Sequence, residues 1–271
     1  MEWAHILPLL IGGLVLFLYA INQLSSILSE IFTDKAKTII KRFTSNLFTA
    51  ILVGTGLTIL LDSSSAVIIL TIVFINAGSL SFKQAVGIIM GANIGTTFGS
   101  QIIALDVGKF AIYPMLIGLA MNIFFRNKAF KQYGSIMLYF GMLFFGLYIM
   151  EESVLPLRDS QEFVDWIARI ENNHVEGAIS GGIITLLVQS SSATVGMAIV
   201  LGKQNLINLS GGIAVMLGAE LGTCSDTLLA TINSTRQALK AGLFHLLFNF
   251  ITICIGLLIF NPFVSLVQNI S

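Results

Sequence analysis

One segment of the chain is repeated 127 residues later. Residues 54–97 and 181–224 align without a gap and share 13 identities in 44 pairs. The identities cluster at two motifs, Ser-Ser-Ser-Ala at 63–66 and 190–193 and Gly-Ala-x-x-Gly-Thr at 91–96 and 218–223. Because self-similarity at a fixed period indicates a repeat architecture, the chain is expected to fold as two related halves, residues 1–134 and 135–271.

Both halves are strongly apolar. Hydrophobic residues make up 55% of the chain and charged residues only 10%, and the mean hydropathy is +0.90, which is typical of an integral membrane protein. A membrane-spanning helix needs roughly 20 mainly apolar residues. Six segments are expected to span: 6–28, 86–105, 110–125, 135–150, 213–231 and 238–260.

Two further apolar stretches carry the serine runs. Residues 48–77 and 178–202 are too short to cross a membrane twice and are interrupted in the middle by serines, so each is expected to form a re-entrant helical hairpin. Each half then has three spanning helices, one re-entrant hairpin and one amphipathic interfacial helix, near Ile39–Phe43 and Trp166–Ile170. Three crossings per half is an odd number, which predicts an all-α membrane protein with two inverted-topology repeats.

Charge distribution predicts the orientation. Lys and Arg gather in two segments, at Lys35, Lys37, Lys41 and Arg42 and at Arg126, Lys128 and Lys131. These segments are expected to be cytoplasmic by the positive-inside rule. The opposite loop is acidic, with Glu151, Glu152, Asp159, Glu162, Asp165, Glu171 and Glu176 against Arg158 and Arg169. We therefore expect a multi-pass protein of the cell membrane, with both termini outside and the first hairpin entering from the cytoplasm.

The serine runs suit an anion. A hairpin that reverses at a serine run leaves the first N–H groups of its returning helix without helical partners. Serine side chains can cap such groups, and the aligned N–H groups and the positive end of the helix dipole attract negative charge. The candidate substrate ligands are Ser63, Ser64, Ser65, Ser190, Ser191 and Ser192. Two opposed tips would bracket one small oxyanion near the middle of the membrane.

Oxygen-bearing side chains near the second motif suit a cation. The stretch Gly91–Thr97 and its copy have the composition of a helix that is interrupted at membrane depth, in segments 86–105 and 213–231. Close helix packing explains Gly87, Gly91 and Gly95 equally well. Ionisable groups within a membrane are expensive and usually functional. The candidate cation ligands, for a hard ion such as sodium, are Asp62, Asn93, Thr96, Thr97, Glu220, Thr223 and Asp226.

Several other classes of protein are disfavoured. Acidic and basic residues balance at 14 each, so no global field attracts nucleic acid. Cys224 and Cys254 lack the spacing of a disulfide framework or a zinc site, and neither serine run has a nearby base, so no enzyme activity and no cofactor are expected. His245 and Asn249 lie one helical turn apart, which favours a structural hydrogen bond.

The paired serine motifs, each followed by a Gly-Ala-x-x-Gly-Thr segment, resemble the type II sodium-dependent phosphate cotransporter family, whose mark is a paired Gln-Ser-Ser-Ser within inverted repeats. The resemblance implies a secondary transporter that imports inorganic phosphate with sodium as the coupling ion, by an elevator-like movement. By position it adds Gln189 to the substrate-binding and cation-binding residues. Asp62 stands where the family has Gln, and Glu220 where an Asn would complete the second copy.

These two carboxylates leave alternatives open. A cation-coupled or proton-coupled carrier or exporter of another small anion fits them, and a passive channel or a membrane scaffold without transport is a weaker reading. No Lys or Arg lies in either hairpin, so dipoles, hydroxyls and co-transported cations would neutralise the anion. Some bacterial relatives carry a soluble regulatory domain after the membrane part, and none is expected before Ser271. A homodimer is compatible with the sequence.

Overall fold

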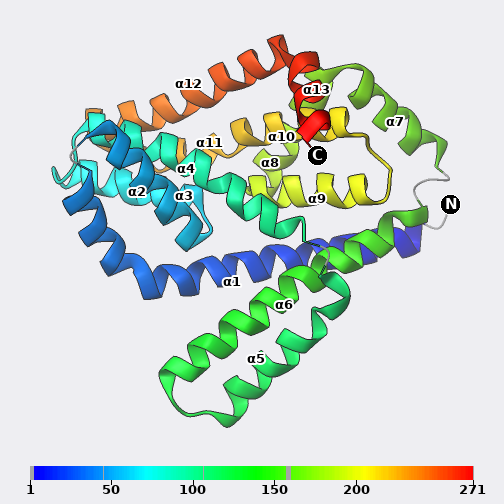
Figure 1. The fold of residues 1–271 in the computed structure, drawn as a ribbon, viewed down its shortest axis with the longest axis horizontal. Coiled ribbons are helices and arrows are strands. Elements are labelled where there is room, and N and C mark those ends of the chain that lie inside the picture. The colour runs from blue at the N-terminus through cyan, green and yellow to red at the C-terminus, as the bar shows by residue number, and fades with distance from the viewer. Residues whose placement is uncertain (1–2, 45, 106, 157–159, 271) are drawn as a thin grey trace.

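The protein is helical throughout the part that the structure describes. The computed structural model describes residues 3–44, 46–105, 107–156 and 160–270. Four of its helices are long and apolar enough to span a membrane: α1 (Trp3–Phe43), α4 (Phe82–Ile103), α6 (Lys128–Val154) and α12 (Arg236–Leu258). The expected all-α membrane protein is confirmed at this level (Figure 1).

Four of the six expected spans are single helices of spanning length, and the other two segments are built from shorter helices. Residues 110–125 form the end of a short 3-10 turn, η1 (Gly108–Phe110), and α5 (Ile112–Phe124). The 13 residues of α5 cover about 20 Å at 1.5 Å per residue, short of the ~30 Å of a hydrocarbon core. Residues 213–231 are divided between α10 (Leu209–Gly222) and α11 (Cys224–Leu229).

The two serine segments form matching helix pairs. In the first half α2 (Leu47–Leu61) is followed by α3 (Ser64–Asn76), and 127 residues later α8 (His174–Val188) is followed by α9 (Ser191–Lys203). The side chains that cap these helices and the next one also recur at this offset, as Asn46 and Asn173, Ser63 and Ser190, and Ser81 and Asn208. Equivalent capping residues therefore start equivalent helices in the two halves.

Close glycine contacts join α2 to α4 and α8 to α10. A Cβ atom on Gly54 would overlap the carbonyl oxygen of Ile88, and one on Gly91 would overlap that of Ile51. The equivalent glycines of the second half, Gly181 and Gly218, approach the backbone of the facing helix in the same way. Small residues of this kind let helix backbones approach closely, which drives helix association in a membrane.

The interruption that the sequence predicts in the first half is wrong. α4 runs as one helix from Phe82 to Ile103, through the whole Gly91–Thr97 stretch. Its glycines serve the packing against α2: a Cβ atom on Gly95 would lie 2.6 Å from the Cβ of Thr58. The contact surface of α2 stabilises the continuous helix, since each turn of α4 places a glycine where the α2 backbone comes near.

The separate interfacial helix expected near residues 39–43 is also wrong, because α1 continues without a break from Trp3 to Phe43. In the second half, α6 ends at Val154 and α7 (Gln161–Asn172) begins after Ser160, which caps it. Pro156 lies between them, and proline disfavours continuation of a helix. The side chains of Lys35, Lys37, Lys41 and Arg42, and residues Arg158 and Asp159, lie outside the described part of the structure.

The last helices of the two halves pack differently. α12 covers α3 and α4, where Ala238 and Ala241 are fully buried and the ring of Phe244 meets that of Phe82 edge-on with centroids 6.4 Å apart. The equivalent helix α5 instead packs on α6, and the two project together from the rest of the molecule (Figure 1). α13 (Phe260–Ile270) follows α12 and stacks Phe260 on His174.

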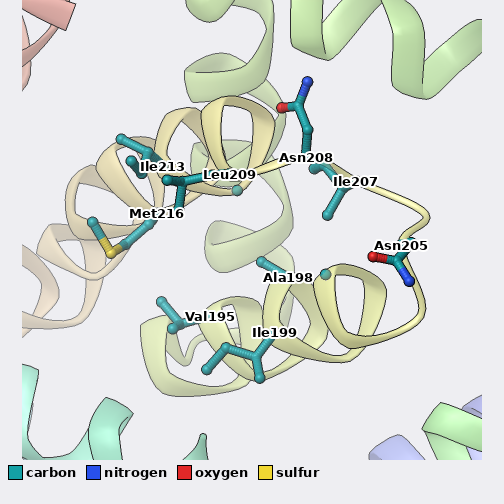
Figure 2. A pocket seen from close by; sticks show the side chains of 11 residues that line it. Val195, Ala198, Ile199, Asn205, Ile207, Asn208, Leu209, Ile213 and Met216 are labelled. Atoms are coloured by element: carbon teal, nitrogen blue, oxygen red, sulfur yellow. The ribbon is translucent and has the colours of Figure 1, made fainter. Parts of the chain in front are cut away.

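In the second half, α9 and α10 are the equivalents of α3 and α4. The surface of α9 and α10 equivalent to the one that α12 covers on α3 and α4 is open in the described part of the structure. It lines a groove of about 450 Å³ with mainly apolar walls. Figure 2 shows Val195 and Ile199 of α9 opposite Ile213 and Met216 of α10, with Asn205 at the edge. Because its lining includes no charged residue, this groove does not offer the chemistry of an ion site.

Candidate anion site at the two serine turns

The two serine turns meet at one cavity. The turn between α2 and α3 and the turn between α8 and α9 both line a space of about 190 Å³. The lining residues are Ile21, Asn22, Asp62, Ser63, Ser64, Ser65, Gln189, Ser190, Ser191, Ser192, Thr223 and Asp226. All seven residues expected to bind substrate therefore lie around a single space, although they come from segments 127 residues apart in the chain.

The two turns have the same backbone geometry. Asp62 and Gln189 both adopt the left-handed helical region, with φ of 50° and 56°. This region is uncommon for residues other than glycine and reverses the chain directly after α2 and α8. The next residue caps the returning helix in both turns: the hydroxyl of Ser63 accepts from the N–H of Ala66 at 3.1 Å, and that of Ser190 from the N–H of Ala193 at 3.2 Å.

The chemistry of the cavity is polar but has no cationic side chain. Helix geometry leaves the first backbone N–H groups of α3 and α9 without intrahelical acceptors, and both helices begin at this cavity. Hydroxyls and amides supply further donors. Among the residues that the structure describes, the lining holds two carboxylates, Asp62 and Asp226, and no Lys or Arg. An anion held here would need a cation, a proton or both beside it.

The two carboxylates come from different elements. Asp62 reaches α4 at Gly99, where a Cβ atom would lie 2.9 Å from its Oδ1 atom, so a glycine leaves room for the carboxylate. Asp226 belongs to α11, and its Oδ1 lies 3.5 Å from the hydroxyl of Ser225. Thr223, also at the cavity, donates its hydroxyl to the carbonyl of Ala219 at 3.2 Å.

The other expected cation ligands do not line this cavity. The hydroxyls of Thr96 and Thr97 donate to carbonyls of their own helix, those of Ala92 and Ile94, at 3.0 and 2.7 Å. Such bonds are common for threonine within helices. The side chain of Asn93 donates to Asn249 of α12. Glu220 is half-buried in the same region.

Asn249 is the centre of a buried polar cluster. Its Nδ2 lies 3.0 Å from the carbonyl oxygen of Glu220, 3.2 Å from the Sγ of Cys224 and 3.2 Å from the Nε2 of His245. The Nδ1 of His245 in turn lies 2.8 Å from the hydroxyl of Thr227. The structural hydrogen bonds expected of His245 and Asn249 are therefore present and join neighbouring helices, with α12 tied to α10 and α11 and, through Asn93, to α4.

We expect Asn249→Ala to lower the unfolding temperature of the purified protein. The substitution strands several buried polar groups, each worth about 1–3 kcal/mol. The matched control is Asn122→Ala, at the equivalent position 127 residues earlier, because Asn122 is half-buried and accepts one bond from Ser135 at 3.1 Å. An unfolding temperature of Asn249→Ala equal to that of Asn122→Ala would show that the cluster does not stabilise the fold.

Two residues of the cavity were missed by the sequence analysis. Ile21 and Asn22 reach it from α1, outside both repeated motifs. A signal was present, because Asn22 is polar within an apolar span and polar residues in such spans tend to make specific contacts. Within the described part of the chain, no group of three or more His, Cys, Asp or Glu residues could hold a metal ion.

The sequence is similar to known proteins. A family model described as Na+/Pi-cotransporter matches residues 16–152 and 157–264. The uncharacterised protein YqeW of Bacillus subtilis is 26% identical over 258 residues, which cover 95% of this chain and 84% of that protein. The protein YjbB of Escherichia coli, named for inorganic phosphate export, is 23% identical over 259 residues, 95% of this chain but 47% of YjbB.

A mammalian protein is similar over a shorter segment. The sodium-dependent phosphate transport protein 2A of Rattus norvegicus is 34% identical over 106 residues, which cover 36% of this chain and 16% of that protein. The chain thus spans about half the length of YjbB and a smaller part of the rat protein. No solved structure gives a significant match.

Proposed function

Because the chain belongs to the Na+/Pi-cotransporter family, we propose that it is a secondary transporter that carries inorganic phosphate together with sodium ions. The family accounts for phosphate transport and for a multi-pass membrane protein, and as a transporter family it agrees with the expectation that the chain is not an enzyme. The observation that carries the assignment of the site is the meeting of both serine turns at one cavity. We place phosphate between these turns.

The proposed mechanism is alternating access. The turns come from equivalent helix pairs of the two halves, and Figure 1 shows α2 and α3 to the left of the molecule and α9 to the right. By analogy with transporters built from inverted repeats, we infer two re-entrant hairpins of opposite orientation whose tips hold substrate near the middle of the membrane. An elevator-like movement of the hairpins past the α1–α6 pair would expose the site to each side in turn.

We assign sodium to the cavity because the cavity lining carries negative charge. The described residues of the lining include two carboxylates and no basic side chain. Repulsion between one carboxylate and an anion about 4 Å away would amount to about 4 kcal/mol at an effective dielectric constant of 20. We assign sodium binding to Asp226, Thr223 and Gln189, which offer the hard oxygen ligands that such a cation prefers. The Asp62 carboxylate can accept either a cation or a hydrogen-bond donor.

The orientation follows from the charged segments. The side chain of Lys128, at the start of α6, forms an exposed ion pair of 3.3 Å with Glu30 of α1, so the turn between α5 and α6 lies beside the second half of α1. Both regions are basic in sequence, and we assign them to the cytoplasmic side of the cell membrane. This orientation requires η1 with α5, and α10 with α11, to cross the membrane as well, and it places both termini outside. An inward sodium gradient would drive phosphate import.

Uptake of labelled phosphate into proteoliposomes tests the proposal. We expect phosphate to accumulate above its equilibrium level when an inward sodium gradient is imposed, and to stop accumulating when choline replaces sodium. Equilibration without accumulation would indicate a passive channel. An absence of phosphate flux at every sodium gradient would refute the proposed function.

Export is the second candidate, because the relative YjbB is named for inorganic phosphate export. The two directions separate in membrane vesicles of known orientation. Sodium-driven accumulation in right-side-out vesicles supports import, whereas accumulation only in inside-out vesicles supports export.

A further inference from the structure

The two turns of the cavity differ at one equivalent position. Asp62 and Gln189 stand 127 residues apart, have the same left-handed backbone and line the same space. A glutamine amide can donate an N–H to an oxygen of an anion, whereas an ionised carboxylate can only accept. The turns therefore present opposite hydrogen-bonding chemistry to whatever lies between them.

An oxyanion that carries a proton satisfies both turns. Inorganic phosphate and arsenate have at least one O–H group at neutral pH, whereas sulfate has none. An O–H group that donates to a carboxylate forms a short, charge-assisted hydrogen bond, about twice as strong as a neutral one. An unprotonated oxygen at the same place meets only charge repulsion.

The surroundings of Asp62 support a role as an acceptor. In the described part of the chain, the one other carboxylate of the lining is Asp226, which comes from α11, and no Lys or Arg lines the space to neutralise Asp62. Gly99 of α4 faces Asp62, and a Cβ there would lie 2.9 Å from the Oδ1 atom. α4 thus offers room for the carboxylate but no charged partner at that contact.

We propose that Asp62 accepts a hydrogen bond from the protonated oxygen of the bound anion and so makes the site selective for protonated oxyanions over sulfate. This inference rests on the proposed function, because it names the form of substrate that the same site takes. In this arrangement the donors of the α8–α9 turn, including Gln189, hold unprotonated oxygens, and Asp62 holds the O–H group. Asp62 is then a specificity residue and not a ligand of the coupling ion.

Competition against phosphate uptake in proteoliposomes tests this at fixed neutral pH. In the wild-type protein we expect arsenate to compete and sulfate to be at least about 100-fold weaker, since a site built around a substrate O–H strongly rejects an analogue that lacks it. Asp62→Asn keeps a residue type that tolerates the left-handed backbone and adds an N–H donor. We expect this variant to bring sulfate within about tenfold of arsenate, with an unchanged half-saturating sodium concentration.

The matched control is Asp226→Asn, which removes the other carboxylate of the cavity. It should shift the sodium curve and leave sulfate excluded. If Asp62→Asn transports too slowly to assay, protection of the purified variant from thermal unfolding by phosphate, arsenate or sulfate gives the same ranking.

Two outcomes would overturn the inference. The first is an Asp62→Asn variant that still excludes sulfate, and a shifted sodium curve with it would make Asp62 a cation ligand. The second is a wild-type protein that accepts sulfate as readily as arsenate. A wild-type protein that carries no phosphate under any sodium gradient would instead refute the proposed function itself, so the two failures are distinguishable.

Discussion

Replacing Ser191 by alanine is expected to abolish phosphate transport while the protein still folds. Ser191 is the first residue of α9, lines the cavity between the two turns and is only 5% exposed. A hydrogen bond to a charged group contributes about 1.5–3 kcal/mol. Its loss alone weakens binding of the anion by about 10-fold to 150-fold, and misplacement of the anion lowers the transport rate further.

Gln189→Ala should have the same effect by a different route. Gln189 sits at the tip of the second turn and does not cap α9, because Ser190 does so. Removing its amide takes away a donor to the anion and, in the proposed site, an oxygen ligand of sodium. Both variants should elute as single species in gel filtration and keep an unfolding temperature close to that of the wild-type protein.

Ser135→Ala is the matched control for these variants. Ser135 lies in the apolar helix α6, is half-buried and donates to Asn122 at 3.1 Å, but it does not line the cavity. Its replacement should leave transport close to the wild-type rate. Transport at the wild-type rate in either Ser191→Ala or Gln189→Ala would remove the second serine turn from the substrate site.

The duplication explains why much of this site could be predicted from the sequence. Identical residues at equivalent positions adopt equivalent local structures, so the Ser63 and Ser190 caps could be inferred from the motifs alone. Both turns line one cavity because they occupy equivalent positions in the two related halves. Asn22 escaped the same reasoning because its equivalent in the second half is Ile149, and a search for repeated polar residues passes over a position that is polar only once.

The two wrong predictions, an interruption in α4 and a separate helix at the end of α1, concern features that depend on more than the local sequence. The composition of Gly91–Thr97 suits both an interrupted helix and a closely packed one, and the outcome depends on the backbone of α2 that faces it. The continuity of α1 was missed because an amphipathic run was taken as a separate helix. Only in the second half does a helix breaker, Pro156, stand between the two segments. The facing helix is not visible in a repeat alignment, whereas the missing breaker is, because Pro156 aligns with Ser29.

The second large effect is expected for Gly54→Ala, which should lower the unfolding temperature strongly. The added Cβ would overlap the carbonyl oxygen of Ile88 and lie 2.9 Å from its carbonyl carbon and its Cα. These are backbone atoms of α4, so no flexible side chain can move aside. Overpacking of this kind typically costs about 1–3 kcal/mol. Gly54 lies where α2 contacts α4, and α2 leads into the first serine turn. The added Cβ should therefore also separate the two helices.

Gly56→Ala is a sharp control for this effect. It lies two residues along the same helix, and a Cβ there has no atom within 4 Å. Since alanine favours helix by about 1 kcal/mol over glycine, this variant should unfold at the same or a higher temperature than the wild-type protein, measured for both in one detergent. An unfolding temperature for Gly54→Ala equal to that of Gly56→Ala would show that the α2–α4 contact can adjust to the added Cβ. Close packing would then not explain the glycines of α4, and the cation-binding role that the sequence also allows would be favoured.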